Sequence, residues 1–232
     1  MYIAARFINQ QTKSDLYSVN EKGELLYKGM PYHTQTSVND IIAEYGVKVY
    51  SFADPLKRFC IDVLGAPEES CYGTDEQKNA PIEHLLWNNL PLELRLLNCV
   101  SGASGVPISG DKHGPMTGRE LMQTFGTNIC RSLYYDCWAR GTFNSIKREG
   151  IPLALICDGR FPNEINMGNA LKAKTVRLLR APHADDQHPS ETALDDFPLD
   201  KYSYVLDNRE MSLEEHCQVM DSTIDEWLSS CF

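Results

Sequence analysis

Charged side chains follow three apolar runs of the sequence, and their types suit phosphate chemistry. The three groups are Asp54 with Lys57 and Arg58, Asp158 with Arg160, and Arg180 followed by His188 and Glu191. Arginine can bind phosphate oxygens through two parallel hydrogen bonds, and it can stabilise charge on a transferring phosphoryl group. Ligands of open parallel sheets gather outside the carboxyl ends of the strands. We therefore expect these groups to share a site.

Asp158 is the candidate magnesium ligand. It follows the apolar run 152–157, as the acidic residue that positions Mg²⁺ does in many nucleotide-binding folds. An aspartate after a strand can also have the simpler role of capping a turn. Arg160, two residues later, favours a catalytic role for Asp158. Asp54 precedes Pro55, a pattern typical of a helix N-cap, with or without an added ligand role.

Two further arginines, Arg119 and Arg131, fall in a segment predicted to be helical. Either can be a solvated helix residue or a substrate ligand, and their spacing does not decide between these roles. His188 by itself is typical of a loop histidine. All three remain candidates for substrate binding, and Arg119 also for catalysis.

The elements that would position these residues alternate between strand and helix. An amphipathic helix is predicted at about 37–45, a strand over 47–53, and a helix from Asp54 to Gly65. This order is typical of an α/β fold with a parallel sheet flanked by helices. Later strands are predicted at 152–157, 175–179 and 204–206, and later helices at 163–171 and 212–229.

The remaining segments are less regular. Residues 2–8, 15–19 and 25–27 are predicted to form an N-terminal β-meander or hairpin. Residues 66–116 hold many Pro and Gly residues and are predicted to be an irregular flap insertion with a short helix at 82–87. A capping box at Thr117 to Glu120 starts a helix predicted to reach about Arg140.

Composition narrows the function class. The 232 residues suit one large domain, and the net charge of −10 argues against a sequence-independent grip on duplex nucleic acid. No apolar run is long enough to cross a bilayer. The eight cysteines are scattered, without a C-x-x-C pair or a signal peptide. We expect a cytoplasmic protein without a zinc site or a membrane partner.

Four motifs occur in the order found in one enzyme family. They are Ser51-Phe52-Ala53-Asp54-Pro55-Leu56-Lys57, the segment Gly118-Arg119-Glu120-Leu121-Met122-Gln123-Thr124-Phe125-Gly126-Thr127, Asp158-Gly159-Arg160-Phe161-Pro162-Asn163-Glu164, and the segment from His188-Pro189-Ser190-Glu191 to Asp196. In this, residues 47–228 resemble the phage deoxynucleoside monophosphate kinases. The resemblance implies a P-loop kinase fold, ATP with Mg²⁺ as phosphoryl donor, a deoxynucleoside monophosphate as acceptor, a mobile arginine-bearing lid and a homodimer.

The chain departs from this family at its start. Family members carry a phosphate-binding loop of the form G-x-x-x-x-G-K-[ST], whose backbone N–H groups cradle phosphate. Aligned on that loop, residues 29–36 keep Gly29 and Thr36, but Gln35 replaces the lysine. Gln has no charge to offset a polyphosphate. Residues 1–36 therefore form either a degenerate loop region or an unrelated appendage to a kinase-like domain at 37–232.

Three functions remain open from the sequence. The first is phosphoryl transfer from ATP to a deoxynucleoside monophosphate. The second is a catalytically inactive descendant that binds a nucleotide or a partner protein, which the missing lysine favours. The third is nucleotide hydrolysis on the same scaffold. The acidic segment 181–200 is expected to be a lid, a base-recognition loop or a solvated loop.

Overall fold

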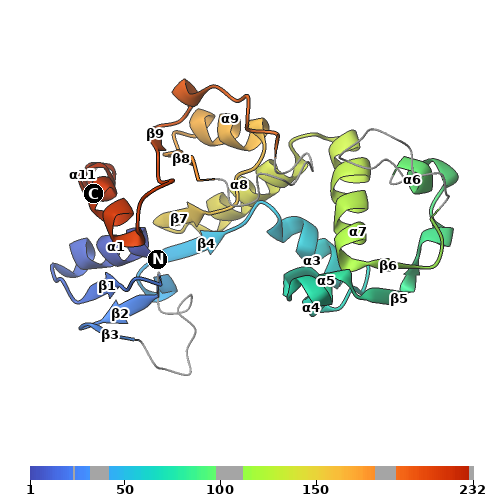
Figure 1. Ribbon diagram of the computed structural model, residues 1–232, viewed down its shortest axis with the longest axis horizontal. Helices are drawn as coiled ribbons and strands as arrows, with labels where there is room; N and C mark the ends of the chain where they lie inside the picture. The colour runs from blue at the N-terminus through green and yellow to red at the C-terminus, as the bar shows by residue number, and fades with distance from the viewer. Residues whose placement is uncertain (23, 32–41, 98–111, 181–191, 230–232) are drawn as a thin grey trace.

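The computed structural model describes residues 1–22, 24–31, 42–97, 112–180 and 192–229. Two pairs of parallel strands lie near its middle (Figure 1). β4 (Val47–Tyr50) pairs with β7 (Leu153–Ile156), and β8 (Val176–Leu178) pairs with β9 (Tyr204–Leu206). These strands are parallel as predicted, but among the described residues they form two separate two-stranded sheets and not one continuous sheet. The chain is a mixed α/β protein.

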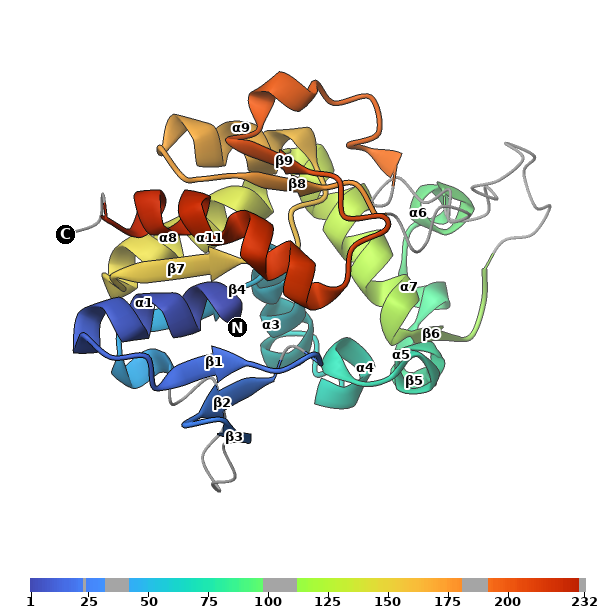
Figure 2. The same cartoon turned by 60° about the vertical axis from the view of Figure 1, so that its left-hand side comes forward.

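Four helices surround the parallel strands (Figure 2). They are α1 (Tyr2–Thr12), α8 (Cys137–Glu149), α9 (Pro162–Ala170) and α11 (Leu213–Ser229). The main core joins Phe7 and Ile8 of α1 to Val47 of β4, Leu206 of β9 and Ile224 of α11, all of them buried. Helix α11 begins after Ser212, whose hydroxyl and Glu215 form the predicted capping interaction. No described helix is both long and apolar enough to cross a membrane.

The first element is a helix, so the strand predicted over residues 2–8 is wrong. Its buried residues are Ala4, Ala5, Phe7 and Ile8, a spacing that places them on one helical face. A strand would turn the adjacent Ala4 and Ala5 to opposite sides. Arg6 also pairs with Asp225 of α11, with 3.1 Å between Nε and Oδ1. Long-range packing against α11 therefore decides this segment.

A small antiparallel sheet follows α1 and confirms the predicted hairpin. It contains β1 (Tyr17–Val19), β2 (Leu25–Tyr27) and β3 (Met30–Pro31). Lys28 and Gly29 connect β2 to β3 with φ of 52° and 75°. Two successive positive φ angles are typical of a tight hairpin turn. Of the predicted helix at 37–45, residues 42–44 are described and are helical.

The region after β4 forms a second, mostly helical part of the molecule (Figure 1). Its core contains Cys60, Cys71, Ile82, Trp87 and Met116. The elements are α3 (Asp54–Asp62), α4 (Glu68–Tyr72), α5 (Asp75–Asn79), β5 (Pro81–Leu86), η1 (Trp87–Asn89), α6 (Leu92–Leu97), β6 (Pro115–Thr117), α7 (Gly118–Gln123) and the π-helical segment η2 (Thr124–Arg131). The short 3-10 helix η3 (Leu199–Lys201) lies outside this part and packs against α9.

Two predictions in this region are wrong. Of the segment 82–87, predicted to be a short helix, residues 82–86 belong to strand β5, which pairs antiparallel with β6, and Trp87 begins η1. Short apolar runs do not distinguish strand from helix, and only the distant partner decides. The long helix predicted to reach Arg140 is instead divided into α7, η2 and α8.

The π-helical geometry of η2 changes which residues share a face of the helix. A π-turn takes more residues than an α-turn, so the apolar stripe that continues from Leu121 to Leu133 in the sequence drifts off one face, and Leu133 is 83% exposed. Trp138 of α8 donates its indole N–H to the Gly126 carbonyl at 3.1 Å. Phe125 stacks on Phe59 of α3 at 4.6 Å. These contacts fix η2 between α3 and α8.

Gly118 allows α7 to begin directly against α4. The predicted capping box between Thr117 and Glu120 is present. A Cβ atom on Gly118 would lie 2.1 Å from the backbone oxygen of Ser70, which is far too close. Replacing this glycine therefore requires backbone movement.

We predict that Gly118→Ala lowers the free energy of unfolding by about 1–3 kcal/mol, because the added methyl group overpacks this contact. Gly168→Ala is the control, since its Cβ would meet only ordinary contacts at 3.7 Å within helix α9. We expect Gly168→Ala to stay within about 1 kcal/mol of the wild type, towards higher stability. Urea denaturation measures both. Equal effects at the two positions would contradict the close approach.

Candidate functional site

The carboxyl ends of β4 and β7 are joined through the carboxylate of Asp158. Its Oδ1 accepts a hydrogen bond from the Phe52 N–H at 2.9 Å. Its Oδ2 accepts from the Ser51 hydroxyl and, at 3.4 Å, from the Ala53 N–H. Thr142 of α8 donates to the Ser51 carbonyl at 3.3 Å. Asp158 therefore holds the turn between β4 and α3 in place.

A second carboxylate, Glu164, organises the loop that follows Asp158. It accepts hydrogen bonds from the backbone N–H groups of Arg160 at 2.8 Å and Phe161 at 3.1 Å. Its other oxygen binds the guanidinium of Arg131 at 3.0 Å. Arg131 also lies over the Phe161 ring, 3.9 Å from the centroid. The end of η2 is thereby fixed to the loop that carries Asp158 and Arg160.

This ion pair is buried, with side-chain exposures of 10% for Arg131 and 2% for Glu164. Burial raises the pKa of Glu164, while the two backbone N–H groups and Arg131 lower it in part. From the sequence, Glu164 is part of the 158–164 motif and has no predicted role. Its position three residues after Phe161, the N-cap residue of α9, is the signal that could have found it, because a glutamate at that position accepts from the N-cap N–H.

The other predicted arginines lie in different contacts. Arg119 forms an exposed ion pair with Asp75 at 2.8 Å and a hydrogen bond with Asn79 at 3.2 Å, both on α5. Arg180 donates to the carbonyls of Arg209 at 3.1 Å and Met211 at 2.9 Å. Arg131 thus contacts the loop after Asp158, while Arg119 and Arg180 bind other segments.

Asp54 and Lys57 meet at Tyr72 on α4. The Tyr72 hydroxyl donates to Asp54 Oδ1 at 3.1 Å, and Lys57 Nζ lies 4.5 Å from the ring centroid. Burial, followed by the Asp54 charge, raises the pKa of Tyr72 to about 12. Ala53, not Asp54, is the N-cap residue of α3, and Asp54 lies in the first turn. The expected cap assignment is therefore wrong by one residue.

Most of the acceptor positions of the Asp158 carboxylate are used on the β4–α3 turn, and its predicted contact with Mg²⁺ stays a prediction. A carboxylate has about four acceptor positions, and Asp158 uses three of them on the β4–α3 turn. Among the described residues, no group of three His, Cys, Asp or Glu side chains could hold a metal ion. The geometry gives Asp158 a positioning role.

The remaining predicted site residues belong to segments that are placed apart or not described. Gly29 lies in the turn between β2 and β3. Gln35, Thr36, His188 and Glu191 lie outside the described residues. The predicted contact of these residues with phosphate or substrate thus stays a prediction.

Comparison with known proteins gives one distant relative. Over 199 residues, the chain is 27% identical to a protein of Acanthamoeba polyphaga mimivirus named "Putative deoxynucleotide monophosphate kinase", covering 80% of this chain and 87% of that protein. No protein-family model matches the chain. No solved structure matches it either. The similarity supports a kinase relationship at the level of the family.

We predict that Arg131→Met lowers the free energy of unfolding by about 3–5 kcal/mol at pH 7.5, because it leaves the Glu164 charge buried without its cation. The folded-state pKa of Glu164 is already raised above its ordinary value of 4.5, and loss of Arg131 raises it further. Stability that is present below that ordinary value is then lost as pH rises through the folded-state pKa. The defect should therefore shrink on acidification towards pH 5.

The matched control is Arg119→Met, which removes an exposed ion pair. We expect a change below about 1 kcal/mol, with little pH dependence. Urea denaturation of both variants at pH 5 and 7.5 makes the comparison. A pH-independent loss in Arg131→Met would show that Glu164 is not the group left unpaired.

Proposed function

We propose that this chain is a deoxynucleoside monophosphate kinase, which transfers a phosphoryl group from ATP to its acceptor. The observation that carries the proposal is the convergence of three separate motifs. Ser51 to Ala53 and the 158–164 segment are joined by Asp158. The helical segment that continues the 118–127 motif ends at Arg131, which is paired with Glu164. The name of the mimivirus relative supports the same activity.

In this proposal the acceptor phosphate lies beside the 158–164 loop. Arg160 is exposed there, and its backbone is fixed by Glu164. Arg131 keeps the loop in shape through the same carboxylate, so it acts as a positioning residue. Phosphoryl transfer needs mainly correct placement and charge stabilisation. Asp158 contributes by holding the ends of β4 and β7 together.

ATP and Mg²⁺ belong to the proposal through the family resemblance. The Asp158 carboxylate has most of its acceptor positions occupied, so it would hold Mg²⁺ through the position that remains. Arg119 and Arg180 would contribute to phosphate binding only after exchanging their present partners. His188 and Glu191 are proposed to bind the acceptor from the segment that lies outside the described residues.

A second candidate function is nucleotide binding without phosphoryl transfer. The observation that favours it is the fold of the N-terminal segment, in which α1 occupies the start of the chain and Gly29 serves a hairpin turn. Gln35 stands at the aligned position of the missing lysine and has no charge to bind the donor. A chain of this kind would keep the acceptor site and lose the donor site.

The deciding experiment combines binding and turnover. The full chain is titrated calorimetrically with ATP–Mg²⁺ and with each deoxynucleoside monophosphate, followed by a coupled phosphoryl-transfer assay. Binding of donor and acceptor with turnover supports the kinase. Monophosphate binding without turnover supports the binding protein. Release of inorganic phosphate without phosphorylated acceptor would instead indicate a hydrolase.

We predict that Arg160→Ala weakens binding of the monophosphate about 10- to 100-fold, because a charge-assisted hydrogen bond contributes about 1.5–3 kcal/mol. Arg148→Ala is the control, since Arg148 is an exposed arginine of α8 that donates a hydrogen bond to Ser145 of the same helix. It removes the same charge and should leave the affinity unchanged. Equal affinity of Arg160→Ala and wild type would remove Arg160 from the site.

A further inference from the structure

Three large side chains in succession are exposed between η2 and α8. Leu133 is 83% exposed, Tyr134 44% and Tyr135 52%. Large apolar side chains that are exposed together often mark a place where a ligand or a partner binds. Tyr135 is the one of the three that contacts the loop carrying Arg160, so it is the residue through which this surface meets the candidate site.

The backbone of Tyr135 is fixed to the 158–164 segment. Its carbonyl oxygen accepts hydrogen bonds from Arg131 Nη1 and from Asn163 Nδ2, each at 3.4 Å. Asn163 also donates to the carboxylate of the next residue, Asp136, at 3.0 Å. Donors from η2 and α9 thus hold the same stretch of chain, and the place of Tyr135 beside the loop is set before any ligand binds.

The ring of Tyr135 lies beside the buried guanidinium of Arg131. The Arg131 Cζ atom is 5.7 Å from the centroid of this ring and 3.9 Å from that of Phe161, both within the range of a cation–π interaction. These contacts orient the Tyr135 ring, while about half of the residue stays open to solvent. A flat aromatic surface that is both oriented and accessible suits stacking with another flat ring.

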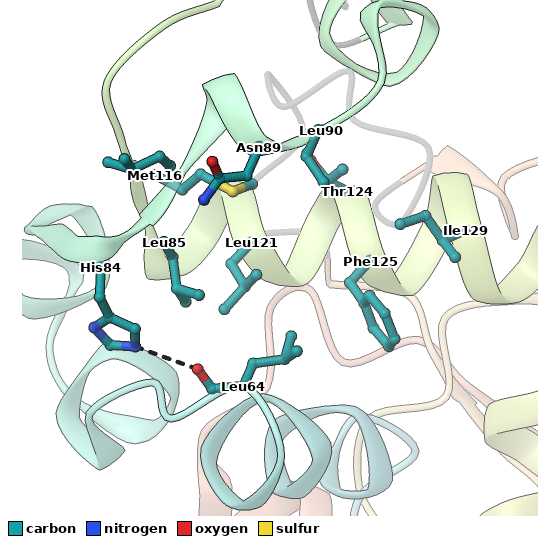
Figure 3. Close-up of a pocket in the computed structure, with 11 residues that line it drawn as sticks. Leu64, His84, Leu85, Asn89, Leu90, Met116, Leu121, Thr124, Phe125 and Ile129 are labelled. Atoms are coloured by element: carbon teal, nitrogen blue, oxygen red, sulfur yellow. Dashed lines mark hydrogen bonds between the residues drawn. The ribbon is translucent and has the colours of Figure 1, made fainter.

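The first part of η2 faces the interior instead. Phe125 and Ile129 line a cavity together with Leu121 of α7, and the side chains around it are mostly apolar (Figure 3). Such a wall suits packing rather than a ligand that bears a phosphate. The two ends of η2 therefore differ, because the first packs within the helical region and the second leads to Tyr135 at the candidate site.

Arg160 and Tyr135 are connected through one carboxylate. Glu164 accepts from the Arg160 N–H and binds Arg131, which in turn donates to the Tyr135 carbonyl. A nucleoside monophosphate carries a phosphate at one end and a flat base at the other. We propose that the base of the deoxynucleoside monophosphate stacks on Tyr135 while its phosphate is bound at Arg160. This inference rests on the proposed function.

Stacking alone would not select one base. Every nucleobase presents a flat π-face, so an aromatic platform binds all of them. The hydrogen bonds of Tyr135 described above use its backbone carbonyl and leave the ring as the contact surface. The proposed subsite therefore accepts all four bases.

The test compares ligands with and without a base. The four deoxynucleoside monophosphates and 2-deoxyribose 5-phosphate are titrated into the full chain and followed by ligand-observed NMR. Tyr135→Ala should weaken each monophosphate about 5- to 100-fold and change the affinity for the sugar phosphate less than about 2-fold, because only the stack with the base is lost. In the wild type, the base protons of the bound monophosphate should shift upfield, since they lie over the tyrosine ring.

Three matched variants separate stacking from folding. Tyr135→Phe keeps the ring and should retain most of the affinity and the upfield shift. Tyr134→Ala removes the neighbouring exposed tyrosine, whose ring and hydroxyl contact Arg140, and should not change the affinity. Arg160→Ala should weaken both kinds of ligand, because both carry the phosphate. Thermal unfolding of each variant verifies that it is folded at the temperature of the titration.

The outcomes distinguish this inference from the proposed function. A loss in Tyr135→Ala that is confined to ligands with a base supports the stack even if no phosphoryl transfer is detected. If Tyr135→Ala binds the monophosphates like the wild type while Arg160→Ala binds them weakly, the acceptor site stands and the stack is overturned. An equal loss for the sugar phosphate, or no upfield shift in the wild type, also overturns it. If the wild type binds no monophosphate, the acceptor site fails together with the stack.

Discussion

The candidate site depends on the hydrogen bonds that the Asp158 carboxylate accepts from residues 51–53. Asp158 follows β7 and accepts hydrogen bonds from the backbone N–H groups of Phe52 and Ala53, which lie between β4 and α3. It therefore binds together two segments that are more than one hundred residues apart in the sequence. Buried N–H groups need partners, and a carboxylate can serve several of them at once. An aspartate with this environment is fixed in position before any ligand arrives. This positioning role accounts for an aspartate directly after the strand, just as a metal-binding role would.

Helix η2 connects the loop after Asp158 to α3 and α8. Its π-helical turns place Phe125 against α3 and leave the Gly126 carbonyl for Trp138, while Arg131 reaches the loop after Asp158. π-helical segments are rare in proteins, and many of those that occur lie at functional sites. η2 therefore contacts α3, α8 and the loop after Asp158. Changes in its packing would therefore affect all three together.

The N-terminal segment has a different role from the one that the family resemblance implies. Helix α1 contributes Phe7 and Ile8 to the main core and is bound to α11 through Arg6. It therefore serves the stability of the domain. The residues that surround Glu164 and the core residues of α1 are different residues, so each set can change without the other. The start of the chain is thus used for packing in the part that the structure describes.

The sequence by itself determined the parallel strands, the helices α3, α9 and α11, the capping boxes and the charged residues after β4 and β7, because these depend on local periodicity and end signals. It did not determine α1, β5 or the division at η2. Those elements are decided by partners far along the chain: α11 for α1, β6 for β5, and α3 with α8 for η2. The pairing of Arg131 with Glu164 was decided by tertiary structure for the same reason. Sequence spacing can name both residues, but only the fold brings a helix end and a loop 33 residues away into one buried contact.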